Sequence, residues 1–217
     1  MFGRRFSISK TRIIAFAVGI LIFGIMLLVS FISETIAVSK GIDDFNELKC
    51  DEFIKGRFVQ GTVQELYFEF AEEWEEQSGS NEKQNKKKYY LIPLIAHENQ
   101  EEIKYIAVRF SKEIDITKAD NLLDEVIKCY NTGEEPISFP TFEITGKVCV
   151  LDEEIEGYLY DALIKYEWGE TKEECKQYVC DYYIDCKEPA SVVELFIGIM
   201  IIVLGVSIIF ITLIKRR

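Results

Sequence analysis

The sequence predicts two transmembrane helices that flank an α+β extracytoplasmic domain, and three observations support this fold class. Residues 13–32 and 195–214 are uncharged apolar runs of 20 residues each. At about 1.5 Å per residue, each run forms a helix of about 30 Å, which matches the hydrocarbon core of a bilayer. Between the runs, segments of strand-like alternation are interspersed with segments of helical periodicity, which favours an α+β domain with an antiparallel sheet.

Basic residues flank each apolar run on the side of the chain terminus. They are Arg4, Arg5, Lys10 and Arg12 before the first run, and Lys215, Arg216 and Arg217 after the second. Because basic flanks tend to stay in the cytoplasm, we expect a plasma-membrane protein with two spans and cytoplasmic termini at residues 1–12 and 215–217. A connector (33–51) and the domain (52–190) then lie outside.

A cleaved signal peptide is the alternative interpretation of the first run. Thr35-Ile36-Ala37 loosely resembles a cleavage site with small residues. The apolar run is longer than the usual 7 to 15 residues of a signal-peptide core, which favours an uncleaved anchor.

The segment between the spans is strongly acidic. Residues 35–190 contain 35 of the 37 acidic residues and 18 of the 25 basic ones, a net charge of −17. Such a surface repels phosphate backbones and anionic headgroups, so nucleic acid is excluded as a partner. The acidic charge either serves solubility or attracts a basic partner or cations.

The first half of the domain shows strand patterns. Residues 57–70 alternate and predict one long strand, bent at Gly61, and the polar stretch 72–88 predicts a loop. Residues 89–96 and 103–110 predict a hairpin, with residues 98–102 in its turn.

The second half mixes helices with strands. Thr117 is the expected N-cap of a helix that ends at Asn131-Thr132-Gly133, residues 142–151 predict a strand, and Asp152 is the expected N-cap of a second helix. Thr171 and Glu174 predict a short helix to about Tyr178, and residues 179–186 are ambiguous between helix and strand. Two strands of the pattern apolar-x-Gly-x-Val leave a small OB-like barrel open as an alternative sheet geometry.

Three short motifs carry a family resemblance: Val59-Gln-Gly-Thr-Val63, Ile144-Thr-Gly-Lys-Val148 with the acid-capped helix after it, and Tyr182-Tyr183-Ile184. Together with the terminal spans, they resemble uncharacterised bacterial two-span membrane proteins with an extracytoplasmic α+β domain. The resemblance covers most of the chain and implies no activity.

All six cysteines lie between the spans. They are Cys50, Cys129, Cys149, Cys175, Cys180 and Cys186. An even number on an oxidising side is typical of disulfides, and the cluster of the last three is the expected place for one. Free buried thiols and a metal site stay open as alternatives, although the cluster lacks the C-x2-C spacing of zinc sites.

The sequence offers no catalytic, cofactor-binding or metal-ligating motif. His97 and Glu101 imitate the zincin pattern H-E-x-x-H with its second histidine replaced, but they fall in the predicted hairpin turn rather than on a helix. Walker A, G-x-G-x-x-G and G-x-S-x-G motifs are missing, and so is the EF-hand loop. We therefore expect no cofactor and no enzymatic activity.

Neither apolar run contains an ionisable residue, which argues against transport by this chain alone. Gly19, Gly24, Gly198 and Gly205 would permit close helix packing, but they form no G-x-x-x-G pair, so we favour the interpretation that they face lipid. Glu34 and Glu194, at the outer ends of the spans, are expected to fix the depth of the helices.

The expected function is that of a membrane-anchored interaction module, with the bilayer and a protein or envelope ligand as partners. An accessory subunit of a membrane transport or envelope complex is the first alternative. A membrane-bound enzyme with an unrecognised site is the second.

Overall fold

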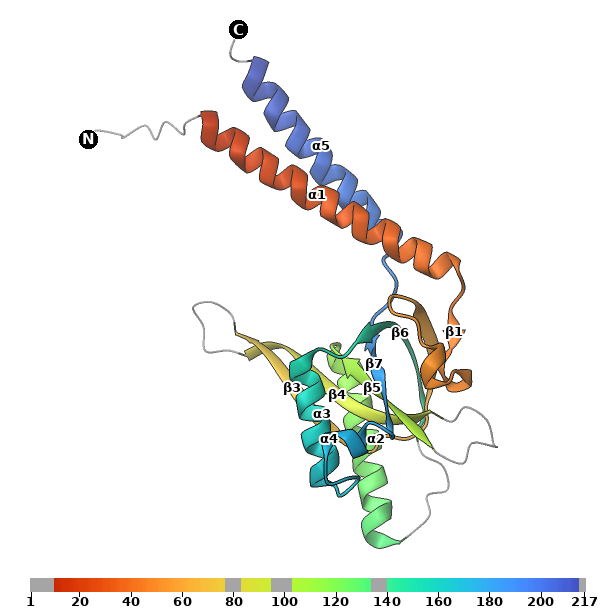
Figure 1. The fold of residues 1–217 in the computed structure, drawn as a ribbon. Coiled ribbons are helices and arrows are strands. Elements are labelled where there is room, and N and C mark those ends of the chain that lie inside the picture. The colour runs from red at the N-terminus through yellow and green to blue at the C-terminus, as the bar shows by residue number, and fades with distance from the viewer. Residues whose placement is uncertain (1–9, 77–82, 95–102, 134–139, 215–217) are drawn as a thin grey trace, which may run out of the picture. The chain divides into compact units, whose positions relative to one another are not determined.

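The computed structural model describes residues 10–76, 83–94, 103–133 and 140–214, and divides into two units (Figure 1). One unit contains the two terminal helices, and the other spans Lys40–Glu188. Each unit is described by itself.

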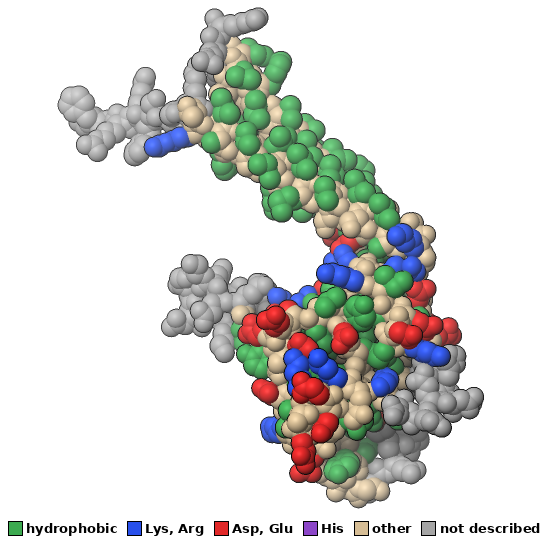
Figure 2. All heavy atoms as spheres, in the orientation of Figure 1, with side chains coloured by type: hydrophobic (Ala, Val, Ile, Leu, Met, Phe, Trp, Pro, Cys, Tyr) green, Lys and Arg blue, Asp and Glu red, His purple; other side chains and the backbone are tan. Residues whose placement is uncertain are grey.

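Helices α1 (Lys10–Ser39) and α5 (Val192–Ile214) are both long and apolar enough to cross a membrane. They pack against each other as an antiparallel hairpin (Figure 1). Their outward-facing side chains are almost all hydrophobic (Figure 2). These two terminal helices confirm this part of the predicted fold class.

Small residues bring the two helix backbones together. A Cβ atom added to Gly205 would lie 3.2 Å from the carbonyl oxygen of Ala17, and one added to Gly24 would lie 2.7 Å from Ile202. Gly198 is buried against Leu28. The expectation that the glycines face lipid is therefore wrong for three of the four. Gly198 and Gly205 are seven residues apart, as are Ala17 and Gly24, so they recur on one helix face without a G-x-x-x-G motif.

Glu34 lies at the end of the hairpin where α1 approaches the start of α5. Its side chain is buried, and its carboxylate accepts a hydrogen bond of 2.9 Å from the backbone N–H of Ala190. Glu34 therefore joins the two helix ends, a role beyond the depth-fixing expected from the sequence.

The domain contains a seven-stranded sheet with the strand order β1-β2-β6-β7-β5-β4-β3. The strands are β1 (Asp43–Asp44), β2 (Phe58–Val63), β3 (Glu69–Glu76), β4 (Lys83–Leu94), β5 (Lys104–Phe110), β6 (Phe142–Val150) and β7 (Val179–Cys186). The β1–β2 and β5–β7 pairs are parallel and the other four are antiparallel. The α+β architecture is confirmed. The sheet is mixed and open, so it does not close into the barrel considered as an alternative.

Helices cover both faces of this sheet. They are α2 (Glu113–Thr132), α3 (Glu153–Lys165) and the short α4 (Lys172–Cys175), and two 3-10 turns, η1 (Phe45–Glu47) and η2 (Cys50–Glu52), precede β2. Tyr90 and Leu91 are neighbours on β4 and point to opposite faces. Tyr90 joins the core cluster that contains Leu122 of α2, and Leu91 joins the cluster that contains Leu159 of α3.

Two predictions for the first half of the domain are wrong. The expected strand 57–70 is two strands, because β2 ends at Val63 and β3 begins at Glu69. The expected loop 72–88 contains most of β3 and the start of β4. Glutamates on β3 face lysines on β4, as in the Glu73–Lys87 register pair, and such opposite charges stabilise a polar ribbon that buries little apolar surface.

The helix boundaries of the second half are mostly as predicted. Helix α2 ends at Thr132 and is capped by Gly133, which has a φ of 68°. Asp152 caps α3 by accepting a 3.0 Å hydrogen bond from the N–H of Ile155. The predicted start of α2 at Thr117 is wrong. Lys112 precedes the first turn, and the Thr117 hydroxyl donates a hydrogen bond to the Glu113 carbonyl instead of capping. The ambiguous stretch 179–186 is strand β7.

Candidate functional site

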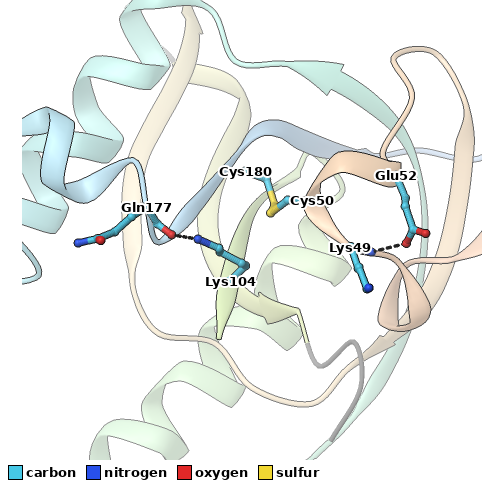
Figure 3. Close-up of a disulfide and its surroundings, with 6 residues drawn as sticks. All are labelled: Lys49, Cys50, Glu52, Lys104, Gln177 and Cys180. Atoms are coloured by element: carbon cyan, nitrogen blue, oxygen red, sulfur yellow. Dashed lines mark hydrogen bonds between the residues drawn. A yellow bond between two sulfur atoms is a disulfide. The ribbon is translucent and has the colours of Figure 1, made fainter. Parts of the chain in front are cut away.

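One disulfide joins the N-terminal part of the domain to the centre of the sheet. Cys50 of η2 and Cys180 of β7 are bonded, with their Cα atoms 5.3 Å apart (Figure 3). The N–H of Lys49 donates a 2.8 Å hydrogen bond to the Glu52 carboxylate beside it. The structure thus pairs one cysteine of the expected cluster with the most N-terminal cysteine of the chain.

The other four cysteines are free. Cys175 and Cys186 are buried, whereas Cys129 and Cys149 are half-buried. Burial raises the pKa of both buried thiols, which keeps them protonated and poorly nucleophilic at neutral pH. Among the residues that the structure describes, no group of three His, Cys, Asp or Glu side chains is arranged to hold a metal ion. His97 and Glu101 lie outside the described residues.

A paired charge cluster links α2 to the sheet. Lys88 is 8% exposed, and its Nζ atom lies 2.7 Å from Glu69 and 2.9 Å from Asp120. The Tyr90 hydroxyl donates a 2.5 Å hydrogen bond to the same Asp120 carboxylate. Although burial alone lowers the pKa of Lys88, the two carboxylates raise it overall, and burial with the Asp120 contact raises the pKa of Tyr90. Lys88 and Tyr90 therefore stay protonated at neutral pH, so this cluster is suited to a structural role and not to proton transfer.

A second paired cluster lies on the opposite face. Arg109 makes a bidentate ion pair with Asp185, with N–O distances of 2.9 and 2.8 Å, and its guanidinium lies over the rings of Tyr89 and Tyr183. The Tyr89 hydroxyl in turn donates a 2.5 Å hydrogen bond to Glu73. The charges of this cluster are also satisfied internally.

Strand β6 is different, because a surface hollow lies on each side of it. Both hollows are lined by Glu143, Ile144 and Thr145, and the two hollows are here called the β6 groove. The hollow beside β2 has a volume of about 350 Å³ and is also lined by Asp44, Gln60, Gly61 and Thr62. The hollow beside β7 has a volume of about 320 Å³ and is also lined by Lys112, Ile114, Asp115, Cys186, Lys187 and Glu188.

The backbone of β2 explains how Asp44 reaches the wall of the groove. A Cβ atom on Gly61 would lie 2.7 Å from the Asp44 carboxylate and from Phe45, so only glycine admits the turn this close to the strand. Asp44 is also the N-cap of that turn, since it accepts a 2.9 Å hydrogen bond from the N–H of Asn46. The same interaction therefore shapes the turn and orients the carboxylate.

The charges of the β6 groove are only partly matched. Lys112 pairs with Glu188 at 2.6 Å, and Asp115 pairs with Lys118 at 3.4 Å. Glu143 and Asp44 are exposed, and within the described part of the chain neither forms an ion pair. A surface that presents carboxylates and threonine hydroxyls can bind a group that donates charge-assisted hydrogen bonds.

Sequence reasoning named Gln60, Gly61, Thr62, Ile144 and Thr145 in its two apolar-x-Gly-x-Val motifs and Cys186 among the cysteines, but it assigned none of them to a groove. The available signal was the alternation of residues 142–151, which places Glu143, Thr145 and Lys147 on the face opposite Ile144 and Val148. The two hollows beside this polar face are also lined by residues of α2 and by the N-cap of η1, which are distant in sequence from β6. The pattern of one strand could therefore not reveal the hollows.

The comparison with protein families gives one match: the family described as Domain of unknown function (DUF8577) matches residues 5–216. The match includes both apolar helices and the whole domain. No curated protein and no solved structure matches the chain.

Proposed function

We propose that this chain, which belongs to the DUF8577 family, is a membrane-anchored module that binds a protein or envelope ligand outside the plasma membrane. The apolar hairpin of α1 and α5 anchors it, both termini are cytoplasmic, and the domain Lys40–Glu188 is extracytoplasmic. Binding, rather than catalysis, is its activity.

Two features support this orientation. Basic residues at both chain ends favour cytoplasmic termini. The disulfide between Cys50 and Cys180 agrees with an oxidising compartment for the domain.

The single observation that carries the binding proposal is the β6 groove. Its two hollows each exceed about 300 Å³, the lower end of the range for ligand sites. Asp44 and Glu143 are exposed there and form no ion pair with any residue that the structure describes, whereas the carboxylates of the Lys88 and Arg109 clusters are paired. Exposed charge beside a hollow is available to a ligand.

Orientation is tested by substituting the exposed Asp161 with cysteine and treating intact cells with a membrane-impermeant maleimide. We expect labelling above that of the unsubstituted chain, whose free cysteines give the background. Extra labelling that appears only after lysis would reverse the topology.

Binding is tested with a photo-cross-linking amino acid at Gln60 or at Thr145, both in the groove. The same group at Asp161 on α3 is the control. We expect discrete cross-linked products from the two groove positions that are absent at the control. Equal products from all three positions would contradict the groove as the binding site. A membrane complex that co-purifies with the chain in mild detergent, without cross-links from Gln60 or Thr145, would favour the accessory-subunit alternative.

A further inference from the structure

We infer that the disulfide between Cys50 and Cys180 is a redox-controlled lock on the N-terminal strap of the domain, defined here as residues 40–54. Its reduction releases the strap and dismantles the hollow beside β2. This inference names the regulation of the β6 groove, so its consequence for binding rests on the proposed function.

The strap lies along the edge of the sheet and forms one wall of the groove. It contains β1, η1 and η2, and β1 pairs with β2 through Asp43 and Asp44. The turn that follows lies so close to β2 that a Cβ atom on Gly61 would be 2.7 Å from Phe45. Because Asp44 lines the hollow beside β2, this hollow loses a wall when the strap leaves the edge.

Besides the disulfide, apolar side chains and an ion pair hold the strap on the sheet. Phe45 and Phe53 are 1% and 2% exposed in the core, and the half-buried Leu48 packs against it. Arg57, which follows the strap, pairs with Asp43 at 2.9 Å. Every residue of the strap loses backbone freedom when it is ordered, whereas only the buried side chains gain free energy from burial. The covalent bond therefore decides whether the strap stays in place.

The position of the strap allows it to leave without disturbing the rest of the sheet. It is the N-terminal segment of the unit Lys40–Glu188, and β1 is the last strand at one edge of the sheet. The pairs formed by β6 with β2 and with β7 do not involve the strap. Terminal segments at an edge are among those that open locally at low free energy. Release of the strap is therefore a local event and not global unfolding.

The disulfide can be reached by a reductant from the side of Cys50. Cys50 is half-buried in the three-residue turn η2, and its neighbours Lys49 and Asp51 are exposed. Cys180, by contrast, is 3% exposed and lies on β7 (Figure 3). An incoming thiolate therefore attacks the Sγ atom of Cys50 rather than that of Cys180.

The reductant that fits this chemistry is a dithiol, such as a protein with a pair of neighbouring cysteines. Its first thiolate forms a mixed disulfide with Cys50, and Cys180 leaves as a thiolate that takes up a proton. Its second thiol then displaces Cys50, so the dithiol becomes a disulfide and its two electrons and two protons pass to Cys50 and Cys180. The core accommodates the product, because Cys186 on the same strand is already a buried free thiol.

The inference is tested by hydrogen exchange with mass spectrometry on the full chain in phosphatidylcholine nanodiscs, with and without dithiothreitol. The amides of Leu48 and Glu52 are hydrogen-bonded within the turns of the strap, so they report whether it is ordered. We expect strap peptides to exchange at least about tenfold faster after reduction, and peptides of α3 to change less than about twofold.

Two double variants assign the response to the correct cysteines. Replacing Cys50 and Cys180 with serine imitates the reduced state, so the strap should exchange fast with and without dithiothreitol. Replacing the free Cys129 and Cys149 with serine is the matched control and should leave the response unchanged. A response to dithiothreitol that persists in the first variant, or disappears in the second, overturns the inference.

Cross-linking from Gln60 in both redox states separates the lock from the proposed function. Release of the strap together with loss of the specific products on reduction supports both. Unchanged exchange in the strap, or faster exchange throughout the domain, overturns the lock, and specific products then still support the proposed function. Products that persist after release show that the hollow is intact, which also overturns the inference. Release of the strap without specific products in either state supports the lock and overturns the proposed function.

Discussion

The helical hairpin and the sheet domain are stabilised by different kinds of contact. Between α1 and α5, Gly24, Gly198 and Gly205 face the other helix, and Gly205 lies against the backbone of α1. In the domain, by contrast, large apolar side chains fill both faces of the sheet, and buried cations such as Lys88 are matched by carboxylates.

This difference follows from the solvent expected for each unit. Lipid is as apolar as leucine, so helices in a bilayer gain little from burying large side chains and associate through close backbone packing. In water, burial of apolar area stabilises the fold, and any buried charge needs a partner. Five substitutions test this contrast, from the largest expected effect to the smallest.

The disulfide is expected to contribute most. Substituting Cys50 and Cys180 with serine opens a loop with a sequence separation of 130 and should lower the free energy of unfolding of the domain by about 3–5 kcal/mol. The fluorescence of Trp74 and Trp168 during denaturant unfolding reports this change. The double substitution of Cys129 and Cys149, which are free, is the control and should cost less than about 1 kcal/mol. Equal effects of the two pairs would contradict the assigned bond.

Replacing Lys88 with methionine should cost about 2–3 kcal/mol. The substitution leaves Glu69 and Asp120 without their cation, and because these side chains are 28% and 40% exposed, the cost stays below that of a fully buried pair. Lys118→Met, in an exposed pair with Asp115, should cost no more than about 0.5 kcal/mol. The pKa of Lys88 is raised, so its contribution persists at neutral pH and is lost only in strong alkali. Similar costs for both lysines in denaturant titrations would refute this role.

In the helical hairpin, we expect substitution of Gly205 to have the largest effect. Gly205→Leu places a side chain against the α1 backbone and should weaken the α1–α5 contact by about 1–2 kcal/mol. Gly19→Leu is the matched control, because a Cβ atom there meets nothing within 4 Å. Spin labels on the exposed Val18 and Val206 report the separation of the helices by electron paramagnetic resonance. A wider separation in both variants, or in neither, would contradict the assigned interface.

A stabilising substitution is available at the end of α3. Glu167 has a φ of 61°, a conformation that favours glycine, and the N–H of Trp168 donates a 3.0 Å hydrogen bond to the Leu163 carbonyl to close the helix. Glu167→Gly should raise the free energy of unfolding by about 0.5–1 kcal/mol. Glu170→Gly, which lies outside the helix, is the control, and both variants are compared by thermal unfolding. A stability gain of similar size in Glu170→Gly would contradict the explanation based on the φ of Glu167.

The smallest expected effect is at Glu65, whose pKa is raised by burial. A carboxyl with a raised folded-state pKa stabilises the fold when protonated, and this contribution fades as the pH rises above its unfolded-state pKa of about 4.3. Glu65→Gln should therefore be more stable than the natural chain at pH 7, by about 0.5 kcal/mol or less, and equal to it below about pH 4. Stability curves from pH 3 to 8 test this sign, and a difference that is independent of pH would contradict it.

The elements that were predictable from the sequence have local causes. The terminal helices follow from unbroken apolar runs, and α3 and α4 follow from the capping residues Asp152 and Thr171, whose side chains accept the expected backbone hydrogen bonds. Strand β6 follows from alternation, because Ile144, Gly146 and Val148 are buried in turn. In each of these elements the deciding interaction lies within a few residues.

The features that escaped prediction depend on distant partners. The extended part of β3 and β4 is polar, and the pairing of glutamates with lysines on the neighbouring strand stabilises it. The turn before β2 approaches Gly61 so closely that the glycine serves contact rather than bending. The pairing of Cys50 with Cys180 and the groove beside Glu143 likewise join segments far apart in the chain.

The bond between Cys50 and Cys180 also determines how the domain responds to mechanical force. Any pull transmitted through the two membrane helices reaches the domain at Lys40 and Glu188, where the chain enters and leaves it. Tension then passes along residues 40–50, through the sulfur–sulfur bond, and along residues 180–188. Most of the sheet lies within the covalent loop and is connected to this path through the pairing of β7 with β5 and β6. When tension is applied at its two ends, a domain closed in this way keeps residues 50–180 within one covalent loop.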